Sequence, residues 1–270
     1  MALKICALAS GSKGNCIYIS SGKTNLLVDA GIPFSAIRNG LKSIGADINE
    51  IDAVLVSHEH TDHIRALAQV SEVAAVYAHE QVWRALDGRA VVCREEKPFC
   101  DDVFSIGDID VTPFRVPHDA AYTVGFSFDA DGGKISVATD LGYMTRGVLS
   151  HLKGSDVVLL ESNHDERLLR NGRYPEALKQ RILSKNGHLS NETCALTVRE
   201  LLSAGGTHTV ILGHLSEENN RPDLAYKTSA AYAERLGARA GEDFTLAVAV
   251  QHEISGLFEC KPFSPHLKRV

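Results

Sequence analysis

The sequence predicts an α+β protein in which two β-sheets face each other and helices cover the outside, an αββα sandwich. Short aliphatic runs alternate with segments whose apolar residues recur three and four positions apart. Some predicted strands are joined by tight turns and others by helical segments, which favours this architecture over a doubly wound sheet. No linker or low-complexity tract interrupts the pattern, so we expect a single domain over residues 1–270.

The first part of the chain supplies five predicted strands. They cover residues 3–10, 16–20, 24–31, 53–57 and 74–79. The first two strands flank a glycine turn at 11–15. A helix is predicted after Pro33, where apolar side chains recur on one face at Phe34, Ile37, Leu41 and Ile44. Ile64, Leu67 and Ala68 predict the opening of a second helix.

The second part of the chain adds further strands and a long amphipathic helix. Two strands are predicted within 103–116, a hairpin within 125–140, and single strands at 156–162, 209–214 and 245–251. The hairpin turn is the Asp131-Gly132-Gly133 sequence, a common tight-turn composition. The helix is predicted from the spacing of Ala195, Val198, Leu201 and Leu202.

Composition favours a cytoplasmic protein with a sizeable core. Hydrophobic residues make up 44% of the chain, yet no apolar run is long enough to cross a bilayer, and the N-terminal segment reads as a strand rather than a signal peptide. The six cysteines are scattered without a CxxC pair, so we expect reduced thiols. The net charge of −6 argues against a broad nucleic-acid-coating surface.

Positive charge gathers in one local stretch, residues 164–188. Six basic residues stand there against three acids. From composition alone, an ordinary solvated helix and loop is favoured over a polyanion site.

The strongest motif is His58-Glu59-His60-Thr61-Asp62-His63, directly after the aliphatic strand AVLVS. At a strand end, residues two apart point the same way, so His58 and His60 can converge on one ion. The turn into the following helix redirects Asp62 and His63 toward a neighbouring point. Imidazole and carboxylate ligands suit Zn, Mn or Fe. Four candidate ligands exceed the need of one tetrahedral ion with an open position, so two ions are the natural inference.

This HxHxDH pattern resembles the motif of the metallo-β-lactamase superfamily, whose remaining positions can be sought along the chain. Asp29, at the end of LLVDAG, matches the aspartate that supports the site from behind. His118 in RVPHDA matches a third histidine, and Asp140 in SVATDLG matches a bridging carboxylate. His214 in VILGHLS matches the last histidine.

The resemblance implies a metallo-β-lactamase fold with two divalent metal ions (Zn, Mn or Fe) per chain. It assigns the ions to two ligand sets that share Asp140: His58, His60, His118 and Asp140; and Asp62, His63, His214 and Asp140. A hydroxide between the ions would be the nucleophile, because metals lower the pKa of bound water. The superfamily hydrolyses lactams, thioesters and phosphodiesters, so the shared motif alone does not choose the bond.

A second histidine points toward phosphodiesters. The tetrapeptide GHLS occurs at 187–190 and again at 213–216. His188, before the predicted helix, resembles an extra histidine of the transfer-RNA-processing phosphodiesterases of this superfamily, which faces the scissile phosphate. It would stabilise the phosphate or protonate the leaving oxygen. The alternative is that His188 only caps the helix.

Several longer stretches resemble the YycJ/VicX (WalJ) group of bacterial metallo-β-lactamase-fold proteins. They are LASGSKGN, LLESNHDERLL, YPEALKQRILSKNGHLSNE and LGHLSEENNRP. The resemblance implies a 5′→3′ double-stranded DNA exonuclease, with Asp62 and His188 as catalytic residues. It also makes the basic stretch a candidate DNA-backbone site, with Arg167, Arg170 and Arg173 as substrate-binding residues.

Other residues near these motifs carry two interpretations each. In the turn at 11–15, either Gly11 and Gly14 simply permit a tight bend, or Ser12 and Asn15 lie under the metals and orient their ligands. We expect Glu161, Asn163 and His164 to support the site by hydrogen bonds rather than as ligands. Asn219 either contacts phosphate or closes a loop.

Other functions remain open at this stage. A thioester hydrolase, a small-molecule phosphodiesterase, an RNA nuclease and a non-catalytic binding protein would all share the same core. The complete ligand set argues against a non-catalytic protein. DNA is the expected partner, no membrane insertion is expected, and the sequence identifies no protein partner.

Overall fold

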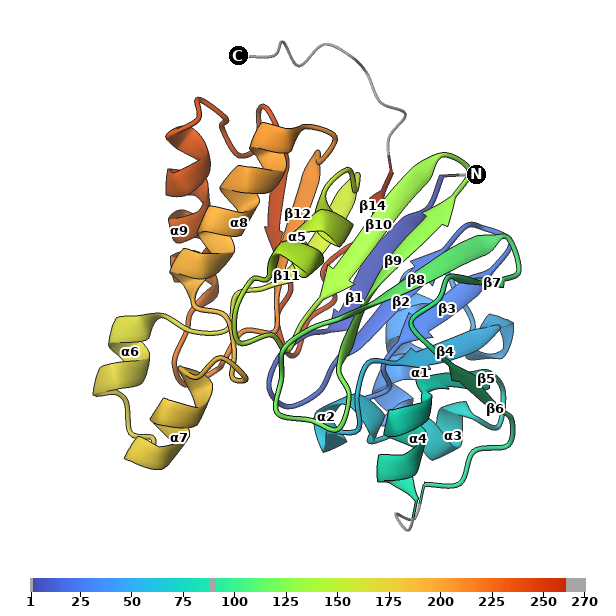
Figure 1. The fold of residues 1–270 in the computed structure, drawn as a ribbon. Coiled ribbons are helices and arrows are strands. Elements are labelled where there is room, and N and C mark those ends of the chain that lie inside the picture. Colours follow the sequence, from blue (N-terminus) through green and yellow to red (C-terminus); the bar gives the residue numbers. More distant parts are fainter. Residues whose placement is uncertain (1, 88–90, 261–270) are drawn as a thin grey trace.

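The computed structural model describes residues 2–87 and 91–260, which form two seven-stranded mixed sheets packed face to face (Figure 1). The αββα sandwich is therefore confirmed. The expectation of one domain over 1–270 stays a prediction, because residues 1, 88–90 and 261–270 lie outside the described part.

The first sheet is antiparallel at one edge and parallel at the other. Its strand order is β14 (Phe258–Glu259), β1 (Lys4–Ala9), β2 (Cys16–Ser20), β3 (Asn25–Val28), β4 (Ala53–Val56), β5 (Ala75–His79) and β6 (Glu96–Phe99). The sequence did not predict β6, an edge strand whose Pro98 breaks the usual strand pattern. The short β14 was also missed.

The second sheet mirrors this arrangement, with four parallel strands followed by three antiparallel ones. Its order is β13 (Thr245–Val248), β12 (Thr209–Gly213), β11 (Val157–Glu161), β10 (Gly133–Ala138), β9 (Val124–Ala130), β8 (Ile109–Arg115) and β7 (Phe104–Ile106). The predicted hairpin is confirmed as β9 and β10, which pair through Ala130 and Gly133.

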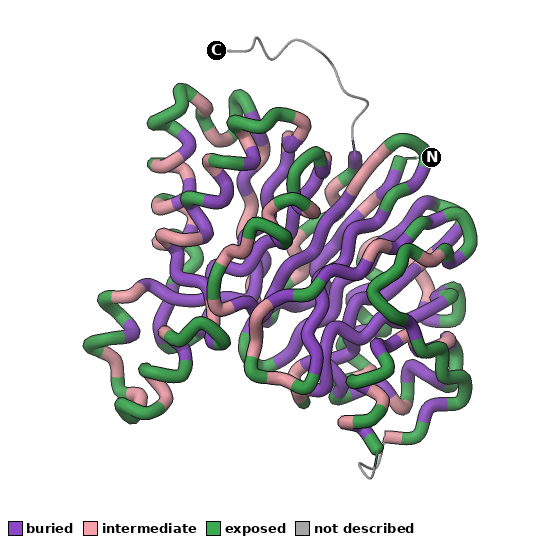
Figure 2. The backbone as a smooth tube through the Cα atoms, viewed as in Figure 1, coloured by how far each residue is buried: buried purple, intermediate pink, exposed green. Residues whose placement is uncertain are grey.

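The core has two layers because strands of the second sheet are covered on both faces. Along β11, Val157 and Leu159 face the first sheet, while Val158 and Leu160 face the helices outside. This double burial explains the unbroken aliphatic run of β11, since parallel strands with two covered faces lose the apolar–polar alternation. Figure 2 shows the buried backbone concentrated in these strands.

Helices cover the outer faces of both sheets (Figure 1). On the second sheet lie α5 (Arg146–Leu152), α8 (Asn191–Ala204) and α9 (Pro222–Glu234). On the first lie α1 (Phe34–Ser43), α3 (Leu67–Val70) and α4 (Glu80–Leu86), with the 3-10 turn η1 (Ile48–Glu50) after α1. Two helices, α6 (Glu166–Asn171) and α7 (Glu176–Ile182), project from the body as a separate arm, which is mostly exposed (Figures 1 and 2).

The helix predicted after the HxHxDH motif is split in two. The chain forms α2 (Thr61–Ile64), turns at Arg65 and Ala66, and continues as α3. The Ala66 amide donates to the Ala30 carbonyl at 2.8 Å, a contact with a distant segment that replaces the helical bond. Sequence periodicity cannot report such a contact.

Within residues 2–87 and 91–260, no helix is both long and apolar enough to cross a lipid bilayer.

The interior between the sheets predicts a strong stability effect at Phe126. This ring is fully buried on β9 and lies near the rings of Phe99 and Phe128. Phe126→Ala should lower the free energy of unfolding by about 3–5 kcal/mol, because it removes a large buried side chain and leaves a cavity. Urea denaturation measures the change. Val92→Ala, at a residue that is 78% exposed, is the control and should shift stability by less than about 0.5 kcal/mol; a similar loss in both variants would contradict this account.

Candidate metal centre

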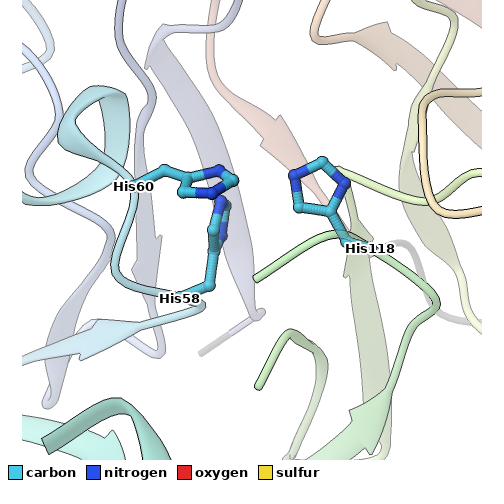
Figure 3. A group of neighbouring side chains, drawn as sticks. All are labelled: His58, His60 and His118. Carbon is cyan, nitrogen blue, oxygen red and sulfur yellow. The ribbon is translucent and has the colours of Figure 1, made fainter. Parts of the chain in front are cut away.

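All seven side chains predicted as metal ligands lie together at one edge of the sandwich, where strands of both sheets end. They are His58, His60, Asp62, His63, His118, Asp140 and His214. Figure 3 shows His58 and His60, on the segment that follows β4, facing His118 from the other sheet. Their rings lie 4.6 to 5.2 Å apart, centre to centre.

Asp140 lies between the two predicted ligand sets. Its carboxylate oxygens are 3.2 Å from His63 Nε2, 3.4 Å from His214 Nε2 and 3.8 Å from His118 Nε2. Asp62 approaches the same space, with Oδ2 at 3.5 Å from His63 Nε2 and 3.9 Å from His214 Nε2. The Asp140 carboxylate thus lies close to imidazoles of both ligand sets.

Ser57 and Asp29 orient the imidazoles at the end of β4. The Ser57 hydroxyl donates to Asp29 Oδ2 at 2.8 Å, so its single proton is used there. His58 Nδ1, 3.0 Å from the same hydroxyl, must therefore be the donor of that contact. His63 Nδ1 donates to Asp29 Oδ2 at 2.7 Å. Asp29 lies behind the imidazoles, as the resemblance implies.

Glu161, the last residue of β11, does the same for two further histidines. Its Oε1 accepts from Nδ1 of both His188, at 2.8 Å, and His214, at 2.7 Å. Its Oε2 accepts from the backbone amides of Leu141 and Leu189. Buried carboxylates require such compensation, and here every contact also fixes a neighbouring segment.

Four histidines of the cluster use Nδ1 in the same way. His118 Nδ1 donates to the Gly187 carbonyl at 3.1 Å, in the same way as His58, His63 and His214 use Nδ1 against an oxygen. Each Nε2 is left to face the cluster. A hydrogen bond on one ring nitrogen is the usual way in which proteins orient the other toward a metal.

Strained backbone conformations gather at this site. Among the described residues, four non-glycine residues have positive φ, and three of them are Asp29 (62°), Asp140 (57°) and His214 (54°). Such conformations cost on the order of 1–3 kcal/mol each and persist where the surroundings enforce them. Their concentration at strand ends indicates that side-chain placement here outweighs local backbone preference.

Gly31 allows the close approach of the segment that carries Asp62. A Cβ at Gly31 would lie 1.6 Å from the Asp62 carbonyl oxygen. The Asn15 amide donates to that same carbonyl, and the Gly31 amide donates to the Asn15 carbonyl, both at 2.8 Å. The glycine turn, the end of β3 and the metal motif are thereby joined.

Charge within the cluster differs between the two ligand sets. Burial lowers the pKa of both His58 and His118, so these imidazoles are neutral. Burial also opposes protonation of His214, but Asp140, Asp62 and Glu161 outweigh it and raise the pKa to about 10. His63, beside Asp29 and Asp140, likewise has its pKa raised well above its usual value. Protons thus balance carboxylates that would otherwise be unpaired.

These residues fit a metal ion in their donor chemistry. Three atoms of the cluster, His58 Nε2, His214 Nε2 and Asp140 Oδ2, are among the buried side-chain atoms that lack a hydrogen-bond partner in the described part of the chain. Buried polar atoms of native proteins are rarely left so, and Asp140 lies in one group of potential ligands with His58 and in another with His214. A cation there would satisfy them and replace the protons on His63 and His214.

The remaining predicted site residues lie in different places. Asn15 Nδ2 is 3.2 Å from His63 Nε2, whereas the Ser12 side chain is exposed on the turn. Sequence reasoning missed Ser10, whose hydroxyl accepts from the His214 amide at 2.8 Å and lies 3.4 Å from Asn15. Ser10 belongs to the LASGSKGN stretch, but a serine that directly follows a strand does not by itself indicate a role in a metal site.

Residues 161–165, with the sequence ESNHD, pack directly against the metal centre. Asn163 Nδ2 donates to the His214 carbonyl at 2.9 Å. The His164 ring is buried, and burial lowers its pKa to about 4, so it is neutral. Asn219 is buried as well, and its side chain contacts the Ser216 hydroxyl at 3.4 Å, which fits loop closure rather than phosphate contact.

His188 lies beside the cluster rather than acting as a helix cap. Its ring centre is 5.1 Å from that of His118 and 5.2 Å from that of His214. The residue that caps α8 is Ser190, whose side chain accepts from the Thr193 amide. The capping alternative for His188 is therefore wrong.

The predicted substrate arginines lie on the exposed arm. Arg167 and Arg170 belong to α6, and Arg173 follows in the connection to α7. Arg170 pairs with Glu166 at 3.1 Å. The structure places these three outside the metal cluster.

This chain resembles known proteins over most of its length. A family model described as "Beta-lactamase superfamily domain" matches residues 24–215. An exodeoxyribonuclease YycJ of Bacillus anthracis is 37% identical over 251 residues, which cover 91% of this chain and 95% of that protein. An exodeoxyribonuclease WalJ of Streptococcus pneumoniae is 36% identical over 248 residues, covering 89% and 92%.

A solved structure shows the same fold at low sequence identity. The metallo-β-lactamase fold protein YhfI of Bacillus subtilis superposes with a TM-score of 0.71 at 17% identity. The match covers 96% of this chain and 100% of that one. Together with the His/Asp cluster, the shared fold indicates that this centre binds divalent metal.

Tight packing at Gly31 predicts a specific sensitivity. Gly31→Ala should lower the free energy of unfolding by about 1–3 kcal/mol or more and reduce bound metal, because the new methyl group must displace the Asp62 carbonyl. Thermal unfolding and elemental analysis of the purified protein measure both effects. Gly147→Ala in α5 is the control, since a Cβ there meets only Thr145 Oγ1 at 3.7 Å. Equal metal content in both variants would argue against this packing constraint.

Metal binding should release protons. His63 and His214 are protonated at neutral pH in the metal-free protein because their pKa values are raised, and a metal on Nε2 must displace those protons. Affinity for Zn²⁺ should therefore rise as pH increases from 6 to 8. Titration calorimetry in two buffers of different ionisation enthalpy counts the released protons. A binding enthalpy that is the same in both buffers would contradict the expectation.

Proposed function

Because this chain belongs to the beta-lactamase superfamily and, within it, to the YycJ/WalJ group of metal-dependent hydrolases, we propose that it hydrolyses phosphodiester bonds of DNA. We further propose that it acts as an exonuclease on duplex DNA from the 5′ end. Polarity and duplex preference rest on the resemblance of its ESNHD and paired GHLS stretches to that group.

The observation that carries the proposal is the position of His188. Glu161 holds the Nδ1 atoms of His188 and His214 on one carboxylate oxygen, so the two imidazoles lie side by side. His214 is buried, whereas the His188 side chain is 16% exposed at the mouth of the centre. A lactam or thioester hydrolase has no evident need for this additional imidazole, while a phosphodiesterase must neutralise an anion and a leaving oxygen.

We propose two divalent ions, with Zn, Mn or Fe as candidates, held by the two ligand sets that share Asp140. His58, His60 and His118 would complete one set, and Asp62, His63 and His214 the other. When bound, the ions would lower the pKa of a water molecule and offset negative charge on the phosphate.

The side chains around the ions would then divide the remaining work. With Nδ1 engaged by Glu161, a protonated His188 has Nε2–H left to donate to a phosphate oxygen or to the leaving oxygen. Asp62 is 28% exposed, whereas the Asp140 carboxylate is 3% exposed, so Asp62 is the carboxylate that can also orient an incoming water. Asp29 and Glu161 would act only by holding imidazoles in place.

DNA would reach the centre beside the basic arm. Arg167, Arg170 and Arg173 are exposed there, and phosphate contacts of this kind position a nucleic acid without reading its sequence. The local arm reconciles a polyanionic substrate with the net charge of −6. A cytoplasmic location stays a prediction.

The test is degradation of a 5′-phosphorylated, end-labelled duplex in the presence of Mn²⁺. Wild-type protein should release nucleotides stepwise from the 5′ end. Asp62→Ala should abolish release, and His188→Ala should slow it by about 10²–10⁴-fold, the usual contribution of one acid–base group. His188→Ala should still bind metal, since His188 lies outside both proposed ligand sets.

His208→Ala is the matched control, because His208 precedes β12 at the end opposite His214. It should leave the rate unchanged. If metal-loaded wild-type protein leaves duplex DNA intact, the exonuclease proposal fails. Hydrolysis of bis(p-nitrophenyl) phosphate in that case would retain a phosphodiesterase, and hydrolysis of a thioester alone would point to the other branch of the superfamily.

A further inference from the structure

Arg181 connects the arm to the edge of the metal centre. It belongs to α7, and its Nε and Nη2 both donate to the carboxylate of Asp119, the second at 2.9 Å. This bidentate pairing fixes the orientation of the guanidinium plane more closely than a single hydrogen bond would. Sequence reasoning counted Arg181 within the basic stretch but did not single it out.

Asp119 in turn adjoins a predicted metal ligand. Its Oδ1 is 3.4 Å from His118 Nε2, the ring nitrogen that faces the cluster. The Arg181 guanidinium is therefore only two successive contacts from the centre. The pKa of Arg181 is raised chiefly by Asp119, and Asp62 and Asp140 add to the effect. The guanidinium therefore lies close enough to interact electrostatically with the carboxylates of the cluster.

The same turn of chain holds Arg181 and His188 in fixed relation. The His188 amide donates to the Ile182 carbonyl at 3.0 Å, so the chain doubles back directly after α7. A Cβ at Gly187 would lie 2.1 Å from that carbonyl oxygen, which leaves room only for glycine. The Gly187 carbonyl also accepts from His118 Nδ1.

Arg181 keeps donors for another anion. Asp119 engages Nε and Nη2, so the two N–H groups on Nη1 are not used in this pairing. The Arg181 side chain is 49% exposed, so it is accessible to solvent. By contrast, the guanidinium of Arg170 pairs with Glu166 on the same helix of the arm.

We propose that Arg181 binds a phosphate of the DNA substrate next to the scissile bond, and that Asp119 positions its guanidinium for that contact. This inference rests on the proposed phosphodiesterase function. Arg181 would approach the phosphodiester from the arm side and His188 from the α8 side. Asp119 acts only through Arg181.

The test compares duplex binding and hydrolysis by the metal-loaded protein and its variants. Fluorescence anisotropy at several salt concentrations would use a labelled, 5′-phosphorylated duplex with phosphorothioate terminal linkages, which resist cleavage. Arg181→Ala should weaken DNA binding about tenfold. It should also reduce the salt slope, which is the slope of log affinity against log salt concentration, by the amount expected for about one phosphate contact. Arg181→Lys should recover the salt slope but only part of the affinity, because an ammonium lacks the planar fork.

Two further variants separate binding from structure. Arg239→Ala removes an exposed arginine that pairs with Glu242. Arg239 precedes β13, at the end of the strands opposite the metal centre, so this variant should change neither the affinity nor the salt slope. Asp119→Asn should weaken binding less than Arg181→Ala, and combining the two should cost no more than Arg181→Ala alone. Metal content and thermal stability are measured for every variant.

The outcomes are distinguishable. If wild-type protein cleaves DNA while Arg181→Ala keeps the wild-type affinity and salt slope, the inference about Arg181 is overturned and the proposed function stands. If wild-type protein neither binds nor cleaves DNA, both fail.

Discussion

The buried carboxylate of Glu161 is the contact on which the rest of the centre depends. One of its oxygens holds His188 and His214, and the other holds the amides of Leu141 and Leu189. These partners come from three separate segments, around residues 141, 188–189 and 214, so a single side chain sets their spacing. His188 and His214 in return lower the Glu161 pKa to about 2, against the effect of burial, and keep it ionised. An ionised carboxylate at this depth is stable only with such partners.

The centre also depends on the packing of the two sheets against each other. The first sheet contributes the HxHxDH motif and Asp29, and the second contributes Asp140, Glu161 and His214. Neither sheet alone brings together a complete set of donors. Metal binding therefore adds to the stability of the sandwich, because the ion binds the folded arrangement and not the unfolded chain.

Local charge matters more than net charge in this molecule. The chain carries an excess of acids, and the centre itself is rich in carboxylates, both of which repel a polyanion. Under the proposed function, the basic residues of the projecting arm would offset this repulsion locally, and Arg181 of the arm pairs with Asp119 beside the centre. Screening by salt confines surface electrostatics to roughly 8–10 Å, so only charges close to the centre would take part.

The sequence by itself determined the fold class, the family and the cluster of seven donors, because strand periodicity and a dense HxHxDH motif are local signals. Tertiary structure decided the rest. Ser10 supports His214 instead of Ser12, α2 and α3 separate at the Ala66 contact, Asn219 is buried, and Arg181 pairs with Asp119 from 62 residues away. Each depends on contacts between segments remote in the chain, whose distances no spacing within the sequence encodes.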